Sequence, residues 1–181
     1  MELTTDRLLL RSIHPEDAVE LSSLVASNRA HLAAWMPWAA ASTPEAVAEF
    51  IAEAVEHEMR EQGYQLAIRI GGNRIAGMVG LHRIDWLQRS ATVGYWIEEA
   101  SQGAGIVSEA LRALLGHAFT ELGLHRIEIR IAPGNERSLA VAQRMGFVLE
   151  GTLREAERWG ESYRDLVVGS LLAPAWGQGV S

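Results

Sequence analysis

The chain carries a decisive stretch at Gly94-Tyr95-Trp96-Ile97-Glu98, which is followed by Gln102-Gly103-Ala104-Gly105-Ile106-Val107 and by an apolar-patterned run to Leu122. The first part has the composition of a strand, and the run after the glycines repeats apolar residues at helical spacing. A strand that ends in a glycine turn and leads into a helix presents free backbone N–H groups at the positive end of the helix dipole. Because glycines carry no Cβ, a ligand can approach this backbone closely. The stretch therefore predicts an anion-binding site.

The segments on either side of this site give a clear order of elements. The patterns predict a strand, two helices, three antiparallel strands, a helix, a strand, a short helix and two closing strands. The predicted strands cover 3–13, 64–70, 74–84, 91–98, 127–131, 147–158 and 162–172. The predicted helices cover 15–28, 44–62, 106–122 and 135–145. We expect an α/β domain with a mixed, mostly antiparallel, splayed sheet flanked by helices.

Composition limits the classes of protein that fit. The 181 residues are enough for one well-packed domain, and 48% of them are hydrophobic. No apolar run reaches the roughly 20 residues of a membrane span, so we expect a cytoplasmic protein without a membrane segment. We predict a single domain over 1–181, with a core from about 3 to 175 and a frayed tail from Pro174 through Gly179.

The residue types that are missing restrict the chemistry. The chain has no Cys, which leaves no disulfide, no thiolate metal site and no cysteine nucleophile to carry an acyl group. We expect no metal site. Lys is absent too, so the 16 basic residues are all Arg, and the formal net charge is −7. That balance argues against a general nucleic-acid surface and favours a cationic or amine-bearing partner.

A second segment, about thirty residues after the glycine turn, adds specificity. Asn135-Glu136-Arg137-Ser138 opens a short helix that closes with Met145-Gly146-Phe147. Together the two segments resemble the acyl-CoA-binding core of the GNAT N-acetyltransferases, in the branch that acetylates ribosomal proteins at an N-terminal Ser or Ala. The resemblance extends over about 3–175 and includes Glu150-Gly151 and Tyr163-Arg164-Asp165.

This resemblance implies acetyl-CoA (coenzyme A) as the cofactor. Gln102 and Gly105 match the family's phosphate-binding pattern, whereas the last position of that pattern does not match. The edge of the strand at Gly94–Glu98 would hold the pantetheine arm, and the N–H of Ile97 would polarise the thioester carbonyl as an oxyanion donor. The candidate cofactor-binding residues are Trp96, Ile97, Glu98, Gln102, Gly103, Ala104, Gly105, Ile106, Val107, Asn135 and Ser138. Asn135 alone could be a helix cap, and Ser138 alone could be a solvated helix position.

The resemblance also supplies two catalytic candidates. Glu157 matches the position proposed as the base, and Ser138 is the candidate for hydrogen bonding to the departing thiolate. On a regular strand Glu155 would point to the same side as Glu157, so spacing alone does not choose between the two acids. An exposed Glu near a hairpin turn is also common without any catalytic role.

Aromatic and polar residues outside these motifs are candidates for the acceptor side. The candidate substrate-binding residues are Trp35, Trp38, His82 and Asp85. Trp86 is a further aromatic that could wall the groove, although packing is the alternative for each Trp. Arg137 and Arg144 could meet the ribose phosphate of the cofactor, or they could be solvated faces of the short helix.

The sequence therefore predicts an acetyl-CoA-dependent N-acetyltransferase that acts on a primary amine by direct attack. The leading acceptor is the N-terminal α-amine of a protein, in particular a ribosomal protein. Two alternatives stay open: acetylation of a small amine such as an aminoglycoside or polyamine, and an acyl-CoA-binding sensor without turnover. A nucleotide-binding regulator is disfavoured, because Ser108 stands where the dinucleotide fingerprint has its third glycine. An exposed last strand favours a homodimer.

Overall fold

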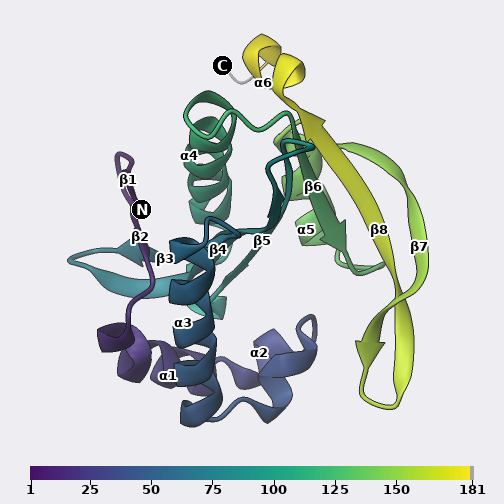
Figure 1. Cartoon of the computed structure of the whole chain (residues 1–181). Helices are drawn as coiled ribbons and strands as arrows, with labels where there is room; N and C mark the ends of the chain where they lie inside the picture. Colours follow the sequence, from purple (N-terminus) through teal and green to yellow (C-terminus); the bar gives the residue numbers. More distant parts are fainter. Residues whose placement is uncertain (180–181) are drawn as a thin grey trace.

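Within residues 1–179, which the computed structural model describes, eight strands form one sheet in the order β1-β2-β3-β4-β5-β6-β8-β7 (Figure 1). Neighbouring strands run antiparallel except β5 and β6, which run parallel. The strands are β1 (Glu2–Thr4), β2 (Leu9–Ser12), β3 (Tyr64–Ile70), β4 (Arg74–Asp85), β5 (Ser90–Ile97), β6 (Arg126–Ile131), β7 (Val148–Trp159) and β8 (Ser162–Leu172). This is the mixed, mostly antiparallel α/β fold that the sequence predicts.

Helices cover both faces of the sheet. α4 packs on one face through its fully buried leucines, and α1 and α3 pack on the other face through Leu21 and Ile51. The helical elements are η1 (Pro15–Asp17), α1 (Ala18–Ser27), α2 (Arg29–Ala33), η2 (Pro37–Ala41), α3 (Pro44–Met59), η3 (Glu99–Ser101), α4 (Ile106–Thr120), α5 (Glu136–Arg144) and α6 (Ala173–Gly179). The helix predicted over 106–122 is confirmed as α4, because its apolar residues recur on one face and become buried.

The N-terminal third differs from the prediction in two places. The strand expected over 3–13 is a hairpin of β1 and β2, because the chain turns where the amide of Thr5 donates to the carbonyl of Leu8 (2.9 Å). The helix expected over 15–28 is confirmed as η1 followed by α1. Two further short helical elements, α2 and η2, occupy 29–33 and 37–41, where the sequence shows no clear period.

β5 and β6 separate halfway along their length, and this gap positions the site. The two strands pair only from Ser90 to Val93 on β5 and from Arg126 to Ile129 on β6. Beyond Val93, β5 continues beside β4, while β6 continues beside β8. The splayed sheet that the sequence predicts is therefore present.

The last two strands form a long hairpin (Figure 1). The final strand, β8, lies between β6 and β7, so the edge of the sheet at this end is β7. The expectation of an exposed last strand is therefore wrong, and the exposed apolar edge belongs to β7, where Val148 is 67% exposed. The homodimer that was inferred from that expectation stays a prediction.

The C-terminal segment is more ordered than the sequence indicates. Where a frayed tail is expected from Pro174, the chain forms α6. The ring of Trp176 on α6 lies 5.8 Å from the ring of Phe119 on α4, and this apolar contact holds the helix against the domain. Val180 and Ser181 lie outside the described residues. Among residues 1–179, no helix has the length and apolar character needed to cross a bilayer.

Candidate active site

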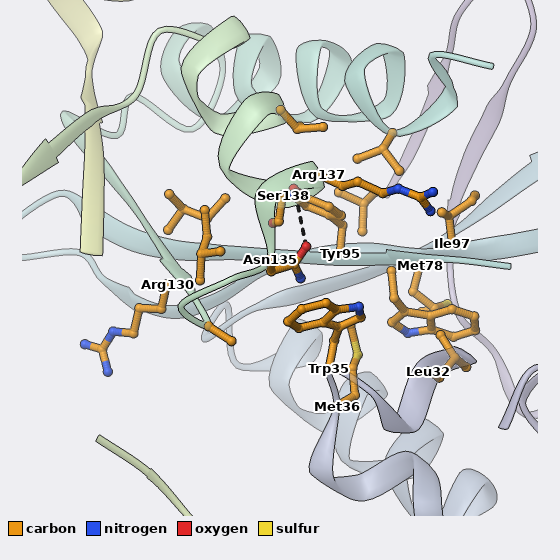
Figure 2. A pocket seen from close by; sticks show the side chains of 18 of the residues that line it. Leu32, Trp35, Met36, Met78, Tyr95, Ile97, Arg130, Asn135, Arg137 and Ser138 are labelled. Carbon is orange, nitrogen blue, oxygen red and sulfur yellow. Dashed lines mark hydrogen bonds between the residues drawn. The ribbon is translucent and has the colours of Figure 1, made fainter. Parts of the chain in front are cut away.

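A cavity of about 1800 Å³ opens where β5 and β6 part. It is lined by α2, η2, part of β4, the start of α4, α5 and the outer part of the β7–β8 hairpin. Figure 2 shows side chains of β4, β5, α2 and the start of α5 that line it. A pocket for one drug-sized ligand has a volume of about 300–1000 Å³. The cavity therefore has room for two substrates at the same time.

The glycine turn before α4 forms one end of this cavity. Gly103 and Gly105 have φ angles of 76° and 77°, in the left-handed region that favours glycine. Gly105 is the N-cap of α4, so the first amides of the helix have no carbonyl partner within it. Both glycines and the following residues Ile106 and Val107 line the cavity. This is the geometry of the predicted anion-binding site.

Two arginines of α5 lie beside this turn. The guanidinium of Arg137 donates to the side-chain oxygen of Gln102, and that of Arg144 donates to Ser108 Oγ (3.1 Å). Both arginines line the cavity, as expected for side chains near the ribose phosphate of the cofactor. Their positive charges add to that of the helix dipole, so this end of the cavity suits a phosphorylated ligand.

The unpaired edge of β5 faces the gap in the sheet. The amide of Glu98 donates to the carbonyl of Ala76 at 2.8 Å, on the β4 side. Successive amides of a strand alternate in direction, so the amide of Ile97 points to the opposite side, where β6 has already diverged beyond Val93. Ile97 and Trp96 line the cavity. The Ile97 N–H is therefore free to meet a carbonyl oxygen there.

Two residues predicted to bind the cofactor have other roles in the structure. The Glu98 carboxylate forms a bidentate ion pair with Arg74 (2.7 and 2.8 Å) and accepts from Ser101 Oγ. The Arg74 hydrogen bonds, followed by that of Ser101, hold the pKa of this carboxyl below its ordinary value. The Ala104 carbonyl accepts from Arg7 (3.0 Å). Neither Glu98 nor Ala104 is among the residues that line the cavity.

Ser138 meets an unexpected partner. Its Oγ lies 2.7 Å from the hydroxyl of Tyr95, which comes from β5, 43 residues earlier in the chain (Figure 2). Burial raises the pKa of the Tyr95 phenol, so this hydroxyl stays protonated. Asn135 caps α5, because its side chain accepts from the amide of Ser138 (3.2 Å). The structure thus brings Ser138 and Asn135 to the gap in the sheet. It also places Tyr95 there, which the pattern of the strand did not predict as a site residue.

Glu157 lies at the other end of the cavity and forms an ion pair with Arg164. The Arg164 guanidinium also donates to the carbonyl of Trp35 (2.7 Å) and lies 3.9 Å from the centre of the Trp159 ring. One arginine therefore connects the β7–β8 hairpin to the segment after α2. Sequence reasoning did not identify Arg164 as a site residue, although it belongs to the quoted Tyr163-Arg164-Asp165 motif.

An irregularity in β7 separates the two glutamates. The pairing with β8 shifts between Leu153 and Glu157. Within this bulge Glu155 has a φ of 49°, and its amide donates to the carboxylate of Asp165 (2.8 Å). Because the strand is not regular, Glu155 and Glu157 do not share a side, and only Glu157 lines the cavity.

Three of the predicted acceptor residues line the cavity, namely Trp35, Trp38 and His82. The Trp38 ring lies 6.1 Å from that of Trp96. His82 Nδ1 lies 2.8 Å from the side-chain nitrogen of Gln65. Burial, followed by the nearby charges of Arg83 and His57, lowers the pKa of His82, so the ring is neutral at pH 7.

The other two acceptor candidates lie outside the cavity. Asp85 accepts from the amide of Gln88 (2.9 Å) in the turn between β4 and β5. The indole N–H of Trp86 donates to the carbonyl of Glu61 (2.7 Å). Each side chain therefore stabilises a turn next to the sheet, and the structure does not bring either of them to the site.

A helix start that suits phosphates, an open strand edge and a cavity for two substrates define an α/β acyltransferase that uses an acyl-CoA. Residues 7–148 match the family model described as the acetyltransferase (GNAT) domain. The chain belongs to the GNAT family, and it is an acetyl-CoA-dependent N-acetyltransferase.

Individual relatives agree with this family. YdaF of Bacillus subtilis (strain 168), whose name provisionally describes a ribosomal N-acetyltransferase, is 35% identical over 176 residues, which is 94% of each chain. The solved structure of RimL, a ribosomal L7/L12 α-N-protein acetyltransferase in complex with coenzyme A, is 27% identical and has a TM-score of 0.90 over 97% of this chain and 99% of its own. The microcin C7 self-immunity acetyltransferase MccE, in complex with acetyl-CoA and AMP, is 29% identical with a TM-score of 0.87 over 93% of each chain.

Proposed function

We propose that this enzyme acetylates the N-terminal α-amine of a ribosomal protein. The observation that carries the proposal is the continuity of one cavity from the glycine turn before α4, past the Ile97 amide, to Glu157. The names of YdaF and RimL support a ribosomal-protein acceptor. Such an acceptor would place the reaction in the cytoplasm.

The donor end of the cavity would hold acetyl-CoA, which supplies the thioester. The amides that follow Gly103 and Gly105, together with Arg137 and Arg144, have the charge to bind its phosphates. The Ile97 N–H would donate a hydrogen bond to the carbonyl oxygen and stabilise the negative charge that develops there.

The acceptor end would prepare the amine. An α-amine has an ordinary pKa of about 7.7–8.0, so a weak base is enough to remove its proton near neutral pH. Glu157 takes that proton, directly or through a water molecule. A bond forms between the nitrogen of the neutral amine and the carbonyl carbon as the carbon–sulfur bond breaks, and the sulfur leaves with its electron pair as a thiolate. The nitrogen then loses one more proton, which passes to the thiolate, so the products are an amide and a free thiol. Ser138, held by Tyr95, donates a hydrogen bond to that sulfur.

A thiol-release assay with acetyl-CoA tests this function. The acceptors are peptides that begin with Ser or Ala, and the matched controls are the same peptides with a blocked α-amine. We expect thiol release only with the free α-amine, and mass spectrometry locates the acetyl group on it. Release with spermidine or an aminoglycoside and with none of the peptides would instead identify a small-amine acetyltransferase. Acetyl-CoA binding without release on any amine would identify a sensor.

A further inference from the structure

The charge of the cavity is opposite to the charge of the protein. The whole chain has a formal net charge of −7. The charged residues that line the cavity, with His taken as neutral, are six arginines and two glutamates, which gives 6 − 2 = +4. At physiological ionic strength the Debye length is about 8 Å, so a ligand inside the cavity responds mainly to these nearby charges.

Three of the six arginines that line the cavity have no role in the cofactor site or in the Glu157 ion pair. Arg137 and Arg144 lie beside the glycine turn, where cofactor phosphates are expected. Arg164 is neutralised by its ion pair with Glu157. The remaining arginines come from three strands around the acceptor end, and they are Arg83 on β4, Arg130 on β6 and Arg158 on β7.

These three arginines keep hydrogen-bond donors available. Arg83 is exposed, and within residues 1–179 its guanidinium has no ion pair or hydrogen bond. Arg130 forms an ion pair with Glu128 through Nε (2.8 Å), which leaves its two terminal nitrogens as donors. Figure 2 shows the Arg130 side chain extending away from the pair formed by Ser138 and Tyr95. Arg158 donates through Nε to the carbonyl of Gly160 (3.0 Å) and lies only loosely near a fully exposed carboxylate of the same hairpin.

We propose that the acceptor is an acidic peptide, in which Asp or Glu residues closely follow the N-terminal amine and bind Arg83, Arg130 and Arg158. The proposal rests on the proposed function and specifies its substrate class. A guanidinium binds a carboxylate through paired, charge-assisted hydrogen bonds, so arginines on three strands can read several acidic side chains.

The same charges act on the reacting amine. A positive environment disfavours an ammonium ion and favours the neutral amine that attacks the thioester. It also disfavours multiply charged cations such as polyamines and aminoglycosides in the acceptor site. The net charge of −7 favours a cationic partner, whereas the positive local charge of the cavity favours an acidic one.

The test compares three peptides with the same N-terminal Ser and the same length. Positions after the Ser carry Asp and Glu in the first peptide, Asn and Gln in the second, and Lys in the third. We expect the acidic peptide to have the highest kcat/KM and the Lys peptide the lowest. Equal kcat/KM for the acidic and neutral peptides would overturn the inference while leaving α-amine acetylation intact. Acetylation of none of the peptides would overturn the proposed function and this inference with it.

Variants then assign the charge preference to residues. Arg83→Gln, Arg130→Gln and Arg158→Gln are each expected to raise KM for the acidic peptide about two- to fivefold, the effect of one exposed ion pair, and to leave KM for the neutral peptide unchanged. The control is Arg112→Gln, because Arg112 is exposed on α4 and does not line the cavity. Equal changes for both peptides would contradict the inference. Arg→Lys at the same positions keeps the charge and should keep part of the preference.

Discussion

The Glu157 carboxylate is held by Arg164, and the same guanidinium reaches the backbone carbonyl of Trp35, 129 residues earlier in the chain. The ion pair holds the carboxylate at the cavity, where we propose that it removes a proton from the incoming amine. The hydrogen bond to Trp35 (2.7 Å) connects the proposed wall of the acceptor site to the hairpin that carries the proposed base. Arg164 is therefore a positioning residue for both.

Replacing the base should slow turnover and leave cofactor binding intact. Glu157→Gln is expected to lower kcat with a Ser or Ala peptide about 100-fold, because general-base catalysis contributes on this order. Thiol release measures the rate, and calorimetry with coenzyme A checks binding. The matched control is Glu155→Gln, since Glu155 lies in the bulge and outside the cavity. Equal losses in both variants would show that neither acid is a specific base.

Removing the partner of Ser138 should weaken its contact with the leaving group. Tyr95→Phe is expected to lower kcat about two- to tenfold, the effect of one hydrogen bond, while KM for acetyl-CoA stays the same. Because the two hydroxyls form one unit, Tyr95→Phe combined with Ser138→Ala should cost less than the sum of the single changes. Tyr163→Phe is the control, since Tyr163 is 60% exposed and lies outside the cavity. Fully additive losses would contradict the coupling.

A negative charge in the glycine turn should weaken cofactor binding. Gly105→Glu places a carboxylate where phosphates are expected, so the Kd for acetyl-CoA should rise about tenfold or more through charge repulsion. Calorimetric titration measures this change. Gly105 also has a positive φ, and Gly72→Glu controls for that strain, because Gly72 has a φ of 82° in the distant β3–β4 turn. An unchanged Kd for Gly105→Glu would remove the turn from the cofactor site.

The Glu150 ion pair should make stability depend on pH in a defined window. Hydrogen bonds from Arg126, followed by Ser170, lower the pKa of Glu150 from 4.5 to about 2. A carboxyl whose pKa is lowered in the folded state stabilises it above its unfolded pKa and loses that effect as the pH falls through the folded pKa. The stability deficit of Glu150→Gln should therefore be full above pH 4.5 and shrink between pH 4.5 and about 2.

Urea denaturation at pH 7 and at about pH 3.5 measures that deficit. Glu161→Gln is the control, because the Glu161 side chain is fully exposed and its basic partner, Arg158, lies as far as 3.8 Å away. A deficit of the same size at both pH values would mean that Glu150 acts through packing and not through its charge.

Local patterns predicted the parts of the fold that depend on neighbouring residues. The run that became α4 shows its buried face at helical spacing, and the glycine turn before it has the φ angles that its composition predicts. The hairpin of β1 and β2 was missed because its turn at Thr5–Leu8 contains no Gly or Pro to mark it. The bulge at Glu155 was missed because side-chain alternation assumes a regular strand.

The site was harder to predict because its contacts join distant segments. Spacing places Ser138 at the start of a helix, but no local pattern brings it to Tyr95 on another element. Arg164 likewise meets Trp35 only after the domain has folded. Asp85 and Trp86 are residue types that often bind substrates, and they lie near β5. In the structure each of their side chains instead forms a hydrogen bond with a nearby backbone group and does not reach the cavity.

Because β5 and β6 diverge after Val93, different parts of the chain line the two halves of the cavity. The proposed donor half of the cavity is built from one central block, residues 94–144, while most of the proposed acceptor wall comes from α2, η2 and β4 before that block and from the β7–β8 hairpin after it, with Arg130 as the exception. Changes in the outer segments can therefore alter which amine is accepted without disturbing the block that we propose to bind the acetyl donor. In this architecture, a new specificity can evolve in the outer segments while the proposed donor site in the middle of the chain stays unchanged.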